Sequence, residues 1–182
     1  QASAAIVAEI NQRAKSLSTV VDAQIGPGGT KQLISDITEG MNQYIADAGA
    51  WYKMTKQRGG ELAPLGYQFD MDTLAIKELG ESIVKDIFPK NQRETAMNML
   101  AKIDELTETR TFENLIELRE VINQLRGKRN LGHSTYEAYN NIMGNIDEEI
   151  ASVAVRMGKD GPQWLKDWED AKATYSEMKK LT

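Results

Sequence analysis

Apolar residues recur along the chain at alternating steps of three and four positions. In the first segment the apolar positions with this spacing are Val7, Ile10, Ala14, Leu17 and Val21. In the second they are Ile34, Ile37, Met41, Tyr44, Ala48 and Trp51. Such an alternation has an average period of about 3.5 residues, which is typical of helices that pack lengthwise with interlocked side chains. We therefore expect each apolar seam to be buried against a neighbouring helix.

Five further segments have a related pattern. They lie over residues 71–88, around 96–106, over 111–127, around 139–157 and around 164–178. No stretch shows the period of two that indicates a strand, and the segments are too short and too often interrupted for one continuous coiled coil. The sequence therefore predicts an all-α fold, an antiparallel helical bundle or array of about seven helices with heptad-like packing and short connections.

Glycine and proline residues mark the breaks between these segments. GPGG at 26–29 is expected to end the first helix, and Phe88-Pro89 is expected to break or sharply bend the chain. RGGELAPLGYQ at 58–68 is the longest irregular stretch, and it contains two of the four prolines. These breaks predict an N-terminal helical hairpin over 1–57, a hinge or linker over 58–70 and a five-helix C-terminal unit over 71–182.

Polar residues at several breaks have the spacing of helix caps. A capping side chain accepts a hydrogen bond from a backbone N–H that the first helical turn leaves unpaired. The predicted caps are Thr30, Asn91 with Glu94, and Ser134 with Glu137, whereas Asp70 and Asp72 before Thr73 are expected to be acids at a helix start and not a calcium loop. In GKDGP at 158–162 the glycine is expected to break the sixth helix, and Pro162 suits the first turn of the seventh.

The segment 111–127 has an unusually wide apolar face. Its apolar residues span well over half of the helical circumference, and they are Phe112, Leu115, Ile116, Leu118, Val121, Ile122 and Leu125. A helix that lies on one neighbour needs a narrower stripe, so this helix is expected at the centre of the C-terminal unit. Arg119 and Arg126 fall within the apolar arc. Each is expected to meet an acidic residue of an adjacent helix, or to reach solvent, because a buried guanidinium group needs a partner.

The same segment runs into RGKRN at 126–130, a short basic end with two interpretations. The favoured one is a helix stop, because cations suit the exposed carbonyl groups of a helix end and because Gly127 and Gly132 can supply a left-handed turn. The alternative is an anion or nucleic-acid contact, although no aromatic residue is interleaved for base stacking. The residues of this possible interaction patch are Arg110, Arg126, Lys128 and Arg129.

Aromatic residues near the end of the chain also allow two interpretations. Trp164, Trp168 and Tyr175 have helical spacing and are expected mainly in the core, and the alternative is an exposed docking face. Trp51 and Tyr52 end the second predicted helix. We expect them to fasten the N-terminal hairpin to the rest of the chain.

Composition narrows the function classes. The 182 residues are enough to bury a core, and the net charge of −5 provides no long-range attraction to phosphate or anionic lipid. The absence of cysteine excludes disulfides, thiolate catalysis and Cys-ligated metal centres. No apolar run approaches the ~18–20 residues of a membrane span. The start, QASAAIVAEI, has neither an initiator Met nor a signal-peptide pattern, so a fragment or processed piece of a longer chain is expected.

No motif predicts a reactive site. GPGGTKQ differs from a phosphate-binding Walker loop, since Gln32 follows Lys31 and a predicted helix precedes the loop. His133 is the only histidine, and one histidine furnishes neither the usual zinc ligands nor a di-iron site. The carboxylate runs at 147–149 and 167–170 are expected to be solvated helix faces. We predict no catalytic residue, cofactor or metal and hence no enzyme, with a carboxylate pair in a helical cleft as the enzyme alternative.

From about residue 69 the order of helical motifs resembles segments of large virion proteins of tailed bacteriophages, the ejected internal or tape-measure-like polypeptides. TFENLIELREVIN at 111–123 is similar to their TF-x-x-L-x-x-L-R-x-x-I-N helix, and IDEEI at 146–150 is similar to the I-D-x-x-I helix that follows it. The W-x-x-A-x-x-x-Y pattern with a closing lysine is matched by Trp168, Ala171, Tyr175 and Lys179. The resemblance implies an architectural, non-enzymatic module within a much longer chain.

The expected function is therefore that of a structural or interaction module of a larger assembly, a fragment of a phage virion protein that acts through helix–helix packing. Its expected partners are protein subunits of the same assembly, a second copy among them, and nucleic acid is a less favoured partner. The expected location is the virion or the host cytoplasm. The alternative is a helical nucleic-acid- or peptide-binding domain that uses the basic patch near 126–129.

Overall fold

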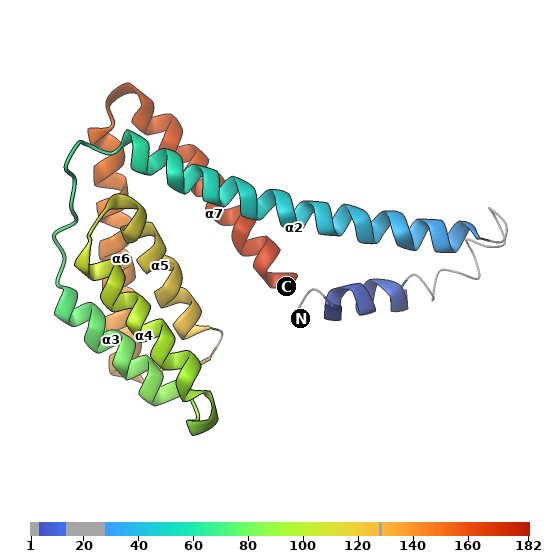
Figure 1. Cartoon of the computed structure of the whole chain (residues 1–182), viewed down its shortest axis with the longest axis horizontal. Coiled ribbons are helices and arrows are strands. Elements are labelled where there is room, and N and C mark those ends of the chain that lie inside the picture. Colours follow the sequence, from blue (N-terminus) through green and yellow to red (C-terminus); the bar gives the residue numbers. More distant parts are fainter. Residues whose placement is uncertain (1–3, 14–27, 128) are drawn as a thin grey trace. The chain divides into compact units, whose positions relative to one another are not determined.

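The computed structural model describes residues 4–13, 28–127 and 129–182, and it is built from helices (Figure 1). Residues 4–13 form the first helix. The others are α2 (Gly29–Leu62), α3 (Thr73–Ile87), α4 (Arg93–Glu108), α5 (Phe112–Arg126), α6 (His133–Arg156) and α7 (Gly161–Lys180), with two short 3-10 helices, η1 (Lys90–Gln92) and η2 (Gly158–Asp160). These described ranges contain seven α-helices and no strand, which confirms the all-α prediction.

The described residues group into two compact units. One comes from Gln1–Thr55 together with Lys166–Thr182, and the other from Lys56–Leu165. This division differs from the predicted hairpin over 1–57 and five-helix unit over 71–182, because the end of the chain groups with its beginning. Both α2 and α7 continue without interruption from one unit into the other. The turn predicted between the first two helices, with most of GPGG, lies outside the described residues.

The predicted hinge over 58–70 is wrong at its start, because α2 continues through Gly59 and Gly60 to Leu62. Gly59 is buried against two aromatic rings. A Cβ atom at this position would lie 2.6 Å from Cζ2 of Trp164 and 3.0 Å from Cε2 of Phe112. Since real Cβ contacts are longer than this, Gly59 serves close packing and does not end the helix. The irregular connection is therefore shorter than predicted and begins after Leu62.

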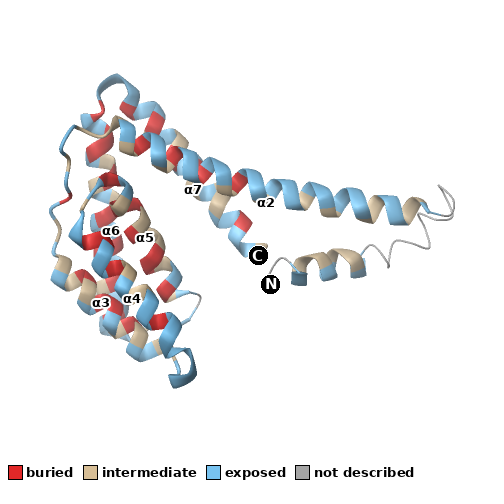
Figure 2. Ribbon diagram, viewed as in Figure 1, coloured by how far each residue is buried: buried red, intermediate tan, exposed pale blue. Residues whose placement is uncertain are grey.

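Helix α5 lies at the centre of the Lys56–Leu165 unit. It contacts α3, α4 and α6. Its buried residues are the predicted apolar set, Phe112, Leu115, Ile116, Leu118, Val121, Ile122 and Leu125. Figure 2 shows the buried positions of α3 to α6 distributed along the lengths of these helices. The contacts of α5 with three helices and the burial of its apolar residues confirm the prediction of a central helix. Because full burial of one large aliphatic side chain contributes about 1.5–3 kcal/mol, α5 supplies much of the core of this unit.

The helix ends confirm one expected acid at a helix start and correct the three predicted caps. Asp72 caps α3, and its carboxylate accepts a hydrogen bond from the backbone N–H of Ala75 at 3.0 Å. Thr30, Asn91 and Ser134 are not N-cap residues. The residues at these boundaries are Gly29 as the first residue of α2, Gln92 as the N-cap of α4 and Gly132 as the N-cap of α6.

The failed caps have a common physical cause. Each of the three residues lies inside a helical turn and not before it, Thr30 in α2, Asn91 in the 3-10 turn η1 and Ser134 in the first turn of α6. The predicted helix breaks are correct where a proline or a glycine sets its own backbone conformation. Pro89 follows the end of α3, and Gly158, with a φ of 73°, separates α6 from α7.

Candidate interaction surface

Three large apolar residues of α2 remain exposed along one line of the helix. Ile37, Tyr44 and Trp51 are spaced seven residues apart, and their exposed fractions are 40%, 38% and 38%. We call these three residues the outer seam. Two heptads of helix place its ends ~21 Å apart, at a rise of about 1.5 Å per residue. The expectation that every apolar seam is buried is therefore wrong for this part of α2.

The other half of the predicted α2 pattern is more covered. Ala48 is buried, and Ile34 and Met41 are partly covered. Tyr52 lies one helical turn after Ala48. Its ring stacks on Tyr175 of α7 with 4.3 Å between the ring centroids, and its centroid lies 5.4 Å from that of Trp168. Tyr52 therefore joins α2 to α7, whereas its neighbour Trp51 is 38% exposed and belongs to the outer seam.

The outer seam is flanked by a second line of α2 residues. Gly40, Asp47 and Met54 each follow a seam residue by three positions, so the two lines together form a stripe with the alternating spacing of a coiled-coil face. Met54 is 67% exposed, and no atom lies within 4 Å of a Cβ placed at Gly40. Asp47 is exposed and its carboxylate accepts a hydrogen bond from Gln43 at 2.8 Å. The stripe is thus apolar, with a carboxylate near its middle.

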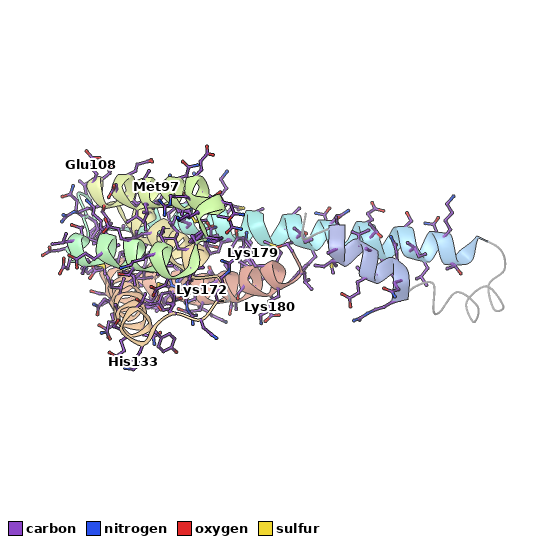
Figure 3. The ribbon with its side chains drawn as sticks, turned by 90° about the horizontal axis from the view of Figure 1, so that it is seen from below. Met97, Glu108, His133, Lys172, Lys179 and Lys180 are labelled. Atoms are coloured by element: carbon purple, nitrogen blue, oxygen red, sulfur yellow. The ribbon has the colours of Figure 1, made fainter. Side chains whose placement is uncertain are left out.

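The aromatic residues of α7 are mostly core residues. Trp164 is buried and packs on Phe112, with ring centroids 5.3 Å apart, and Trp168 is buried beside Tyr52. Tyr175 is partly covered. Lysines of α7 labelled in Figure 3 lie against this series, with Lys172 Nζ 5.7 Å from the Trp168 ring centroid and Lys179 Nζ 5.2 Å from that of Tyr175. The series therefore does not form one exposed docking face.

Two arginines of the predicted basic patch, Arg110 and Arg126, lie at opposite ends of α5. Arg110 precedes the first residue of α5 and Arg126 is its last, so a helix of ~22 Å separates their backbones at about 1.5 Å per residue. Arg110 Nε donates to the carbonyl of Thr107 at 3.2 Å. Arg129 donates to the carbonyl of Ile87 at 2.9 Å and so caps the end of α3. Lys128 lies outside the described residues.

The two arginines of the central helix have different surroundings. Arg119 Nε donates to Asp147 of α6 at 2.7 Å, which confirms the acidic partner expected for it. Arg126 instead lies against the rings of Tyr136 and Tyr139, at 5.5 and 4.7 Å from their centroids, and its Nε is buried without a hydrogen-bond acceptor. Cation–π contacts with α6 therefore take the place of the acidic partner, and Arg126 keeps part of its surface exposed, which is compatible with the alternative expectation of a head that reaches solvent. Gly127 has the predicted positive φ, 55°, but Gly132 does not, since its φ is −58°.

A polar cluster holds the connection between α2 and α3 against α6. Tyr67 donates its hydroxyl to Glu149 Oε1 at 2.8 Å, and Arg156 donates to the same oxygen at 3.1 Å. The Arg156 guanidinium also lies 5.2 Å from the Tyr67 ring centroid. Burial, followed by the hydrogen bond to the Glu149 carboxylate, raises the pKa of Tyr67 far above its usual value. The cluster stabilises the neutral phenol of Tyr67.

This shifted pKa predicts a pH dependence of stability. Because the folded-state pKa of Tyr67 is raised, its stabilising effect is complete below the unfolded pKa of about 10 and is lost as the pH rises above that value. We expect Tyr67→Phe to show a shallower loss of the free energy of unfolding between pH ~9 and ~11 than the wild-type chain. Urea denaturation followed by circular dichroism measures both slopes. Tyr44→Phe, on the exposed face of α2, is the control, and equal slopes for all three chains would contradict the prediction.

A shallow groove of about 440 Å³ lies between α3 and α6. Its walls are mixed, with apolar Ile76, Leu79 and Ile142 beside polar Thr135 and Asn145. The Thr135 hydroxyl is engaged with the Asp86 carboxylate at 3.1 Å. His133, at the start of α6, is 87% exposed and lies 3.3 Å from Glu137, so it faces solvent and not this groove (Figure 3).

The described residues offer neither a metal site nor a membrane span, and the chain matches no known protein in the comparisons below. Within the described ranges, no three or more His, Cys, Asp or Glu side chains are grouped so that they could hold a metal ion. None of the described helices combines the length and the apolar character needed to cross a bilayer. Comparison with protein-family models, with curated proteins and with solved structures finds no match to this chain.

Sequence reasoning missed the outer seam as a surface. The three residues were recognised as members of the apolar pattern, but that pattern predicts burial for every member. No signal in the sequence distinguishes these three residues, because Ile34, Met41 and Ala48 have the same spacing on the same helix and only the packing of the helices decides which line is covered. Tyr67 and its partners left no signal in the sequence, because Tyr67 and Glu149 are 82 positions apart.

Proposed function

We propose that the chain is an architectural, protein-binding module of a larger assembly. The observation that carries the proposal is the outer seam, because three large apolar residues at heptad spacing are exposed on a long helix. Exposed apolar residues that occur singly need no explanation, but a continuous line of them favours an interaction site. Its spacing suits a helix that packs lengthwise on α2.

The chemistry of the outer seam supports the same conclusion. Tyrosine and tryptophan are enriched among the residues that dominate binding energy at protein interfaces, because they bury a large area with few rotatable bonds. Tyr44 and Trp51 would lie at the middle and one end of such an interface. Burial of the remaining exposed surface of the two rings by a partner would contribute to the free energy of binding.

We place the assembly in the virion of a tailed bacteriophage, and the support for this is the resemblance of residues 69–182 to virion proteins. The virion or the host cytoplasm is then the location. The nucleic-acid alternative receives less support, because Arg126 contacts tyrosines and Arg129 caps α3. Mass spectrometry of purified particles tests this placement. Peptides of the chain are expected in the particles, and their absence would contradict a virion role.

Site-specific cross-linking tests the protein-binding role directly. A photo-reactive phenylalanine analogue in place of Tyr44, in the full chain within its native assembly, is expected to cross-link to a protein subunit. Ala46 is the matched control, because it is exposed and lies on the opposite side of α2 from Tyr44. Cross-links from position 46 as strong as those from position 44, or cross-links to nucleic acid alone, would overturn the proposal.

A further inference from the structure

The stripe on α2 carries a charge that limits which helix it can accept. Asp47 lies between Tyr44 and Trp51 along the stripe, three residues after the one and four before the other. A partner helix centred on Tyr44 would cover this carboxylate. Covering a carboxylate without a cation is costly, because the charge loses water and gains no compensating partner.

The rest of the helix does not supply that cation. Between Lys31 and Lys53 the chain contains Asp36, Glu39 and Asp47 but no lysine or arginine. Asp47 already accepts a hydrogen bond from Gln43, which is neutral and leaves its charge uncompensated. This part of α2 is therefore acidic along the whole length of the outer seam.

A second copy of α2 fits this stripe poorly. Antiparallel pairing centred on Tyr44 would match Ile37 with Trp51 of the other copy, which is sterically reasonable. It would, however, cover Asp47 with the middle of the other copy's α2, and residues 32–52 contain no lysine or arginine that could pair with it. The Asp47 carboxylate of each copy would thus be covered without a cation, which disfavours this pairing.

We propose that the outer seam binds an amphipathic helix of another protein that carries a lysine or arginine within its apolar stripe, opposite Asp47. The inference rests on the proposed protein-binding function and adds the chemistry of the partner. Aliphatic residues of the partner would pack around Ile37, Tyr44 and Trp51, and the partner's cation would pair with Asp47. Such a charge within an apolar seam fixes the register and the choice of partner more than it raises affinity.

Designed helical peptides and the full chain test this proposal. The probe has leucine at every a and d position of three heptads except the central a position, which holds lysine in one peptide and glutamate in the other. Fluorescence anisotropy is expected to show roughly tenfold or tighter binding of the lysine peptide, by charge complementarity. In the Asp47→Lys chain the preference is expected to reverse. Ala46→Lys, an exposed position off the stripe, is expected to keep the wild-type preference.

The outcomes separate the two levels of the proposal. If both peptides bind equally and Tyr44→Glu abolishes binding, the seam binds helices but the basic partner is wrong. If neither peptide binds, and if Tyr44→Glu does not change the binding of the chain to any protein subunit of its assembly, the protein-binding function itself is wrong. If light scattering shows a dimer of the chain that Tyr44→Glu dissociates, the occupant is a second copy and the inference is overturned.

Discussion

Leu118→Ala is expected to lower the free energy of unfolding of the Lys56–Leu165 unit by about 2–5 kcal/mol. Leu118 has no exposed surface, and it lies on α5, which contacts α3, α4 and α6. Removing its branched end would leave a cavity inside a close-packed core, which surrounding side chains fill only in part. Urea denaturation of the full chain, followed by circular dichroism at 222 nm, measures the change.

The matched control for this substitution is Leu74→Ala in α3. Leu74 is 66% exposed, so the same chemical truncation removes little buried surface. We expect its effect to stay within about 0.5 kcal/mol of zero. Similar losses from the two substitutions would show that α5 is not the centre of the core, and the packing described for this unit would be wrong.

Gly59→Ala is expected to destabilise the same unit by about 1–3 kcal/mol. This sign is opposite to the usual one, because alanine in a helix interior is normally more stable than glycine by about 0.8–1 kcal/mol. The added methyl group would lie 2.6 Å from the Trp164 ring, and the ring cannot rotate away while Phe112 packs against it. Thermal or urea denaturation of the full chain measures the effect.

Gly144→Ala provides the comparison for Gly59. Gly144 lies within α6 of the same unit, and a Cβ atom added there would have no atom within 4 Å. We expect this substitution to stabilise the unit by roughly 0.5–1 kcal/mol through helix propensity alone. Two substitutions of one chemical kind would then have opposite signs. Stabilisation by Gly59→Ala as well would mean that α2 does not approach Trp164 closely.

The fold could be predicted because the signals for helices are local. Spacing of three and four along the chain indicates a helix without knowledge of its neighbours, and the width of the apolar arc on residues 111–127 indicates how many neighbours α5 needs. Pro89 and Gly158 act through their own backbone preferences, so the breaks next to them were also correct. These features require no information about residues far away in the sequence.

The errors came from features that depend on distant residues. Arg58-Gly59-Gly60 has the composition of a break, but the ring of Trp164, more than 100 positions later, is the reason for Gly59. Arg126 has the chemistry of an ion-pair partner, and the tyrosines of α6 determine its actual surroundings. The site was missed for the same reason. The pattern identifies Ile37, Tyr44 and Trp51 as apolar seam residues, and only the arrangement of helices decides that they stay exposed.

The contact between Arg129 and the carbonyl of Ile87 has a consequence for the order in which the chain folds. Helix α3 ends without a glycine of its own, and part of its closing turn is satisfied by a side chain 42 positions later. The last turn of α3 therefore cannot reach its final stability while α3 stands alone. It must await closure of the chain loop through α4 and α5, and such long-range contacts form late in folding because loop closure costs entropy.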